Sequence, residues 1–123
     1  MMKITVDGKE LKGIIEKVEC NMMKKFTVPD LGRIILKAEN GKLTACSTTI
    51  SNWLFVTMDR WVNVIEEGQI LIDKEDFKVI TRMAGDVTIA ESDNNIIVKN
   101  GKKTITLIKY RFEIKTLIIS LGY

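Results

Sequence analysis

The sequence predicts an α+β fold built from a duplicated β-α-β-β-β unit, with two helices on one face of antiparallel sheets. The first observation is a repeat, because residues 4–15, ITVDGKELKGII, return at residues 70–81 as ILIDKEDFKVIT. In both copies the apolar residues alternate before an aspartate and then recur three and four apart, which is typical of a strand followed by a helix. The second observation is that short alternating runs follow each copy. Two helices cannot cover both faces of so many strands, so we expect them side by side, related by a pseudo-two-fold axis.

The first copy predicts an opening strand near Ile4 and a helix over Gly8–Cys20. After this helix, RIILKAE and KLTACST are short runs with the character of strands. They are joined by Asn40-Gly41, a dipeptide that supplies the positive φ values of a tight hairpin turn. The run SNWLFVTMD then predicts a further strand that ends near Asp59.

The second copy opens with GQILID, and its helix is expected over Lys74–Ala84. Three alternating runs follow, VTIAES, NIIVKN and KTITLIKY, with Asn100-Gly101-Lys102 marking the turn between the last two. The same three residue types stand at Asn40-Gly41-Lys42 in the first copy, and in the second copy they come six residues earlier relative to the helix. We interpret this turn as a further recurrence of the repeat, with one loop shortened.

Composition sets the limits within which these elements must fit. A chain of 123 residues is expected to form a single domain over residues 1–123, and 46% hydrophobic with 28% charged residues is typical of a soluble globular protein. We expect a cytoplasmic protein without a membrane partner, because no run has the length of a signal peptide or of a membrane span. Cys20 and Cys46 are expected to be reduced thiols in or near the core. The net charge of +3 permits an anionic partner without requiring one.

Basic residues recur on the polar sides of both predicted helices. Lys74, Lys78 and Arg82 follow one another at intervals of four residues, opposite the apolar side of the second helix. Lys12 lies outside the apolar stripe of the first helix. Side by side, the helices would present a mostly basic surface to water. The alternative, which the pattern alone favours, is that these cations simply solvate two amphipathic helices, and interspersed acidic residues dilute the patch.

The segment TVPDLGRIILKAENGKLTACSTTIS, Thr27 to Ser51, resembles the stretch that follows the first helix in the bacterial DNA polymerase III beta subunit, the sliding clamp. The opening MKITVDGKELKGIIEKV is similar to the first strand and helix of the N-terminal domain of that family, and residues 69–107 are similar to its remaining elements. The resemblance covers about residues 2–107, and residues 108–123 form a divergent tail. It implies the DNA-clamp fold, in which each domain duplicates a β-α-β-β-β unit and its helices line the inside of a ring.

The resemblance also implies a function, namely sequence-independent association with duplex DNA as a processivity factor in DNA replication. Lys25 and Arg82 match family positions that touch the DNA backbone. Lys24, Lys12, Lys74 and Lys78 are further candidates from the helix pattern, and for each of these four a purely solvating role is an equal alternative. Mobile cations that contact phosphates suit a clamp, because hydrogen bonds to base edges would stop it from sliding.

In the resembled family, neighbouring domains join edge strand to edge strand, so other clamp domains or further copies of this chain are expected partners. The run KKTITLIKY occupies one such edge, with Ile105 at a position that is often an apolar contact and with Thr104 and Leu107 beside it. Because an apolar edge needs cover, we expect the tail to pair with its own sheet or with a partner's sheet. Polymerase and clamp loader stay open as partners, since their cleft lies mainly in the last of the three domains of a clamp subunit.

The sequence contains few of the residue types and motifs that enzymes use for catalysis. The chain has no histidine, and it has no glycine-rich phosphate loop or paired-cysteine site, so no cofactor, metal or catalytic residue is expected. Trp53 and Trp61 are expected to pack in a sheet rather than to form a stacking platform for single-stranded nucleic acid. The alternative function is a clamp-fold protein-interaction module, regulatory or structural, that does not encircle DNA. Neutral or acidic helix faces would favour it.

Overall fold

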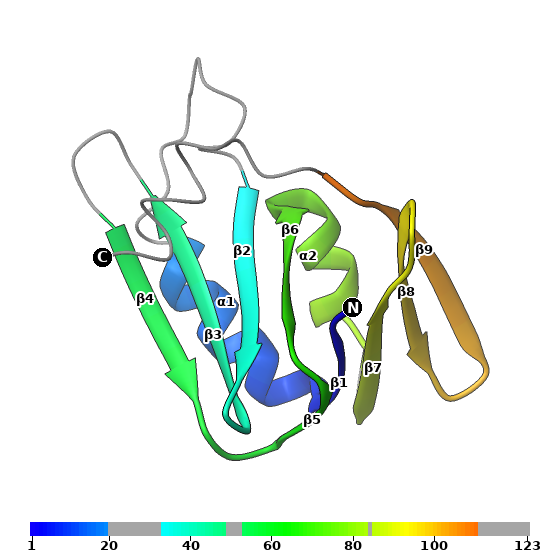
Figure 1. Cartoon of the computed structure of the whole chain (residues 1–123), viewed down its shortest axis with the longest axis horizontal. Helices are drawn as coiled ribbons and strands as arrows, with labels where there is room; N and C mark the ends of the chain where they lie inside the picture. Colours follow the sequence, from blue (N-terminus) through cyan, green and yellow to red (C-terminus); the bar gives the residue numbers. More distant parts are fainter. Residues whose placement is uncertain (20–32, 49–52, 84, 111–123) are drawn as a thin grey trace.

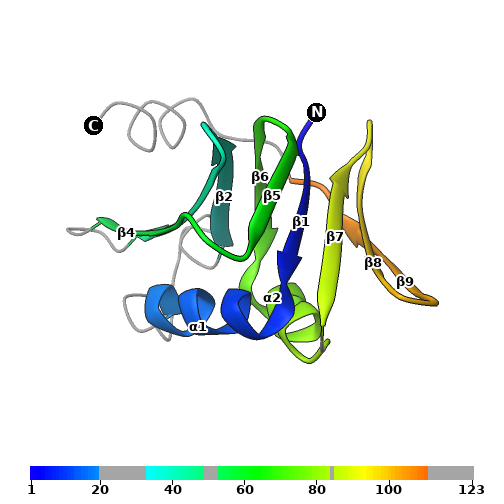
Figure 2. The ribbon, with the colours of Figure 1, turned by 90° about the horizontal axis from the view of Figure 1, so that it is seen from below.

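The computed structural model describes residues 1–19, 33–48, 53–83 and 85–110. Both helices lie on one side of the strands, which form two antiparallel sheets (Figures 1 and 2). The predicted α+β class is therefore confirmed. The elements in chain order are β1 (Lys3–Asp7), α1 (Gly8–Glu19), β2 (Arg33–Glu39), β3 (Lys42–Thr48), β4 (Trp53–Met58), β5 (Val62–Glu66), β6 (Gly68–Asp73), α2 (Lys74–Thr81), β7 (Asp86–Glu91), β8 (Asn95–Asn100) and β9 (Lys103–Ile108).

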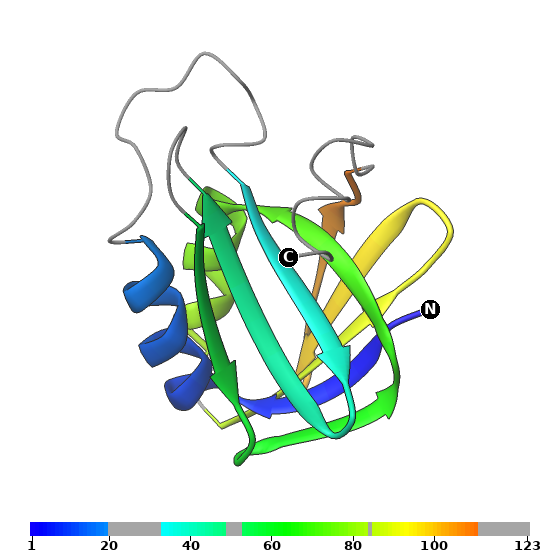
Figure 3. The same cartoon turned by 60° about the vertical axis from the view of Figure 1, so that its left-hand side comes forward.

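The two copies of the unit exchange their first strands. The sheet orders are β5-β1-β7-β8-β9 and β4-β3-β2-β6, so β1 of the first copy joins β7 of the second, while β6 of the second joins β2 of the first (Figure 3). Ile4 lies opposite Ile89 in one sheet, and Ile70 lies opposite Leu36 in the other. The expected pseudo-two-fold relation is thus present in the strand pairing itself.

Equivalent positions of the two copies bury equivalent apolar side chains. Leu11 of α1 and Phe77 of α2 are both fully buried, as the repeat predicts for residues 66 positions apart. After the helices the offset between the copies falls to 53 residues, because α1 and the connection to β2 are together longer than α2 and the connection to β7. With this offset Leu36 corresponds to Ile89, and both belong to the core between the helices and the sheets.

The two Asn-Gly-Lys stretches are not equivalent, so their interpretation as a recurring turn is wrong. Asn40 and Gly41 are the two central residues of the β2–β3 hairpin, with φ values of 54° and 74°. In the β8–β9 hairpin Asn100 is still paired, and Gly101 and Lys102 are central, with φ 60° at Gly101. In the duplicated architecture the partner of the β2–β3 connection is the β7–β8 connection. A common tripeptide therefore serves two different turns.

α2 ends earlier than expected, at Thr81 rather than at residue 84. α1 is described over Gly8–Glu19, and its expected last residue, Cys20, lies outside the described residues. After α2, the N–H groups of Arg82 and Met83 donate to carbonyls three residues back, at 3.3 and 3.0 Å. This tighter closure ends the helix before Gly85, which takes a left-handed φ of 78°.

Strand β5 was not predicted, and with it the described ranges hold nine strands where eight were expected. It pairs with β1 on the side opposite β7, so that Val64 lies opposite Ile4. Trp61, just before β5, is 64% exposed at a left-handed φ of 66°, so its expected packing in the sheet is wrong. Its carbonyl accepts the N–H of Asp7 at 2.9 Å, so the main chain of this residue is fixed while its indole faces water. The side chain of Trp53 lies outside the described part.

Candidate nucleic-acid interface

Two equivalent aspartates fix where the helices begin. Asp7 Oδ1 accepts the N–H of Lys9 at 2.9 Å, and Asp73 Oδ1 accepts the N–H of Glu75 at the same distance. Each carboxylate satisfies a free donor in the first turn of its helix and interacts favourably with the helix dipole. Both helices therefore start directly at the end of a strand, and this fixes their lateral position on the sheets.

A close main-chain contact brings the two helices together. Gly8, the first residue of α1, donates its N–H to the carbonyl of Gly85 at 2.8 Å, just after the end of α2. A Cβ atom at Gly8 would lie 2.5 Å from the carbonyl oxygen of Met83. Only glycine permits this approach, so the start of α1 packs directly on the end of α2.

Between the helices lies a groove of about 290 Å³, the inter-helix groove. Its lining consists of three pairs of two-fold-equivalent residues: Lys12 and Lys78, Ile15 and Thr81, Glu16 and Arg82. Three of the six predicted DNA-contacting residues, Lys12, Lys78 and Arg82, thus meet in one place. Ile15, Glu16 and Thr81 were not singled out from the sequence, although adding the repeat offset to Lys12, Ile15 and Glu16 gives the other three.

The charge of this surface is positive but diluted. Lys12, Lys78 and Arg82 are exposed, and the carboxylate of Glu16 stands among them. Lys78 Nζ lies 3.5 Å from Glu75 Oε1, in an exposed ion pair that restrains the lysine little. At the start of α2, burial and the charges of Asp73 and Glu75 raise the pKa of Asp76. The groove therefore offers phosphates three mobile cations beside acidic neighbours.

The remaining predicted contacts lie elsewhere. Lys74 begins α2, is partly buried and does not line the inter-helix groove. Lys24 and Lys25 lie outside the described residues. In the predicted interface, Thr104 is exposed, Ile105 is partly buried and Leu107 is buried in the core of its own chain. Strand β9 is the edge strand of its sheet, and its contact with a partner stays a prediction.

The described residues lack both a metal-binding cluster and a membrane-spanning helix. Among them, no group of three or more Cys, Asp or Glu side chains could hold a metal ion. Within the same ranges, no helix is both long enough and apolar enough to cross a membrane.

No family model matches the sequence, and no curated protein matches it either. Solved structures match its fold closely. The chain is 21% identical to the Caulobacter crescentus beta sliding clamp, with TM-score 0.81 over 92% of this chain and 32% of that protein. It is 16% identical to the DNA polymerase III beta chain of Streptococcus pneumoniae (TM-score 0.85, 93% and 32% coverage) and 17% identical to the Bacillus subtilis sliding clamp (0.83, 89% and 31%).

The chain thus has the fold of a domain of a bacterial sliding clamp, as the resemblance implied. It spans about a third of the length of these relatives.

Proposed function

We propose that this chain is a non-catalytic sliding-clamp domain that associates weakly with duplex DNA, independently of sequence, as part of a ring that serves a DNA polymerase as a processivity factor. The observation that carries the proposal is the meeting of Lys12, Lys78 and Arg82 in the inter-helix groove, on the side of the fold occupied by both helices. The likeness to sliding clamps supports it.

The inter-helix groove would hold DNA only loosely. Three exposed cations on flexible stems attract phosphates by releasing counterions, while Glu16 and Glu75 limit the attraction. A surface of this kind lets the duplex move along it, because no contact depends on a particular base. A topological ring, rather than affinity, would then keep the domain on DNA. The ring would be closed by other clamp domains or by further copies of this chain, with polymerase and loader as outer partners.

The test is the salt dependence of binding to a fluorescent linear duplex, followed by anisotropy. We expect weak binding, equal for different sequences, with affinity falling steeply as salt rises. The variant Lys12→Gln/Lys78→Gln/Arg82→Gln should make the negative slope of log K against log salt shallower by about 2 to 3, because each lost phosphate contact removes about 0.9 from its magnitude.

The matched control is Lys99→Gln/Lys102→Gln/Lys103→Gln, which removes the same charge from exposed positions on β8, the following turn and β9. It should leave the slope nearly unchanged. Equal effects of the two triple variants would mean that only net charge matters, and a preference for one sequence would contradict a sliding function.

A second candidate function is a clamp-fold module that binds a protein and does not encircle DNA. The observation that favours it is the balance of charge on the helices, where Glu16 lies in the groove and Glu75 and Asp76 begin α2. Absence of DNA binding at low salt, in a folded sample, would select this candidate over the first.

A further inference from the structure

Three apolar side chains are buried on the outer face of the four-stranded sheet. Ile35, Cys46 and Leu71 are 5%, 3% and 1% exposed, and they adjoin one another, since Ile35 lies opposite both Cys46 and Leu71. Their neighbours along each strand, such as Leu36 and Ile70, belong to the core beneath the helices. Because side chains alternate along a strand, this outer cluster points away from the helices.

The pseudo-symmetry provides an internal comparison. In the five-stranded sheet, the positions equivalent to Leu71, Ile35 and Cys46 are Thr5, Thr88 and Lys99, which form a cross-strand row on the outer face. The two threonines are partly buried and the lysine is exposed. The same architecture thus accepts polar residues on a face that meets water. The apolar residues at the equivalent positions indicate that the four-stranded sheet is covered.

The chain leaves β9 in the direction of this cluster. Lys109 donates from Nζ to Glu91 Oε2 at 2.7 Å and to the carbonyl of Ser92 at 3.1 Å, both at the end of β7. This contact directs the chain from the outer edge strand back across the five-stranded sheet (Figure 1). Tyr110 then packs on the outer cluster. The last described residue has therefore left the β9 edge and reached the other sheet.

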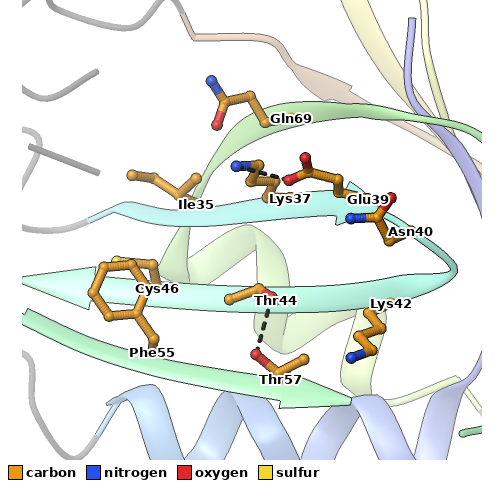
Figure 4. A pocket seen from close by; sticks show the side chains of 10 residues that line it. All are labelled: Ile35, Lys37, Glu39, Asn40, Lys42, Thr44, Cys46, Phe55, Thr57 and Gln69. Carbon is orange, nitrogen blue, oxygen red and sulfur yellow. Dashed lines mark hydrogen bonds and ion pairs between the residues drawn. The ribbon is translucent and has the colours of Figure 1, made fainter. Parts of the chain in front are cut away.

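A cavity of about 380 Å³ lies beside the cluster, on the same outer face (Figure 4). Ile35, Cys46 and Phe55 line one part of it, and charged residues of the β2–β3 hairpin line another. Gln69 also lines it, and its buried Oε1 accepts no hydrogen bond within the described ranges. A buried amide oxygen normally has a donor, which a further stretch of main chain would supply.

We propose that residues 111–123, RFEIKTLIISLGY, pack across the outer face of the four-stranded sheet of their own chain and cover the outer cluster. The segment follows directly on Tyr110, and it is rich in apolar side chains, among them Phe112, Leu117 and Ile119. Covering an apolar sheet face gives these residues the burial that they would lack along a strand edge. The segment thus docks on a face, whereas the sequence led us to expect strand pairing, with its own sheet or with a partner's sheet.

Cys46 reports on this cover, and burial raises its pKa to about 12. With Cys20→Ser removing the other thiol, the rate of Cys46 modification by a thiol reagent at pH 8 is compared between the full chain and a chain ending at Tyr110. Loss of the cover should expose the thiol and accelerate modification by at least roughly tenfold, which corresponds to about 1.4 kcal/mol of protection. Equal rates in two folded proteins would overturn the proposal.

A second measurement keeps the whole chain and so does not depend on the truncated protein folding. A spin label at Ile119→Cys, in a Cys20→Ser/Cys46→Ser background, should broaden the amide signals of β2, β3 and β6 and leave β7 to β9 sharp. Broadening along β9 would mean that the segment covers the edge. Broadening of unlabelled chains mixed with labelled ones would mean that a second copy supplies the cover. Either result would overturn the proposal.

Discussion

Two glycines of α1 look alike in the sequence but meet different surroundings. Gly8 touches the main chain at the end of α2, where a Cβ atom would lie 2.5 Å from Met83 O, 3.2 Å from Gly85 O and 3.3 Å from a methyl of Val87. Gly13 lies in the middle of the helix with nothing within 4 Å of its would-be Cβ. The first glycine is required by packing, and the second only weakens the helix.

Substitution by alanine should therefore change the free energy of unfolding in opposite directions at these two positions. Gly8→Ala forces two backbone segments apart and should lower the free energy of unfolding by about 1–3 kcal/mol. Gly13→Ala should raise it by about 0.5–1 kcal/mol, because alanine favours the helix. Urea unfolding followed by circular dichroism measures both. Destabilisation by both substitutions, or by neither, would contradict the close contact at Gly8.

Glu91 gives the protein a dependence on pH at the acid end. Burial raises the pKa of this carboxyl, but the hydrogen bonds from Lys109 and from the N–H of Met2, together with the positive charges of Lys109 and the N-terminus, outweigh burial and hold the pKa below its usual value. Because the pKa of Glu91 is lower in the folded than in the unfolded state, its ionised carboxylate stabilises the fold at pH values above the unfolded pKa near 4.5. This stabilisation is lost as pH falls through the folded pKa.

Glu91→Gln should lower the free energy of unfolding by about 1–3 kcal/mol at neutral pH, because Lys109 loses its charged partner and keeps only the carbonyl of Ser92. The difference from the unsubstituted chain should shrink as pH falls from 4.5 through the lower folded pKa of Glu91, since protonation of Glu91 leaves both side chains uncharged. Urea unfolding between pH 3 and 7 measures it. Glu39→Gln is the control, because its ion pair with Lys37 is more exposed. A difference that stays constant over this range would refute the role assigned to Glu91.

At the scale of elements, β9 is the last strand of the five-stranded sheet, and no other described strand pairs with its outer side. Asn100 and Lys103 close a two-residue hairpin, so the main chain of Lys103 and of every second residue after it bonds to β8. The N–H groups of Thr104 and Thr106 therefore point outward. We expect the chain to associate at high concentration by adding strands at this edge.

A proline at Thr106, whose N–H points outward, tests association of the chain without disturbing its folding. Thr106→Pro removes an outward donor without removing a bond to β8, so it should shift the chain towards the monomer and change stability little. Thr106→Ala, which keeps the N–H, should associate like the unsubstituted chain. Light scattering over a range of concentrations measures the average mass. A mass that Thr106→Pro does not change would exclude β9 as the interface.

The sequence predicted individual elements better than their partners. The repeat located both helices and eight strands, because alternation and helical spacing are local properties. The helix pattern and the resemblance also singled out Lys12, Lys78 and Arg82, which line half of the inter-helix groove. The pairing of β1 with β7 could not be derived, since periodicity does not say which strands adjoin. The outer cluster was missed for the same reason, because Ile35 and Leu71 become neighbours only once β2 and β6 pair.

At the scale of the whole molecule, the exchange of first strands governs how the chain folds. Strand β2 completes its pairing only with β6, and β1 obtains its inner neighbour β7 only at residues 86–91. Neither half of the chain contains a complete sheet, so the two halves must form in one cooperative step. During synthesis on a ribosome, β1 can pair with β7 only after residues 86–91 have emerged. Contacts of such long sequence separation slow folding. A single ancestral unit, before its duplication, would have needed a second copy of itself to complete either sheet.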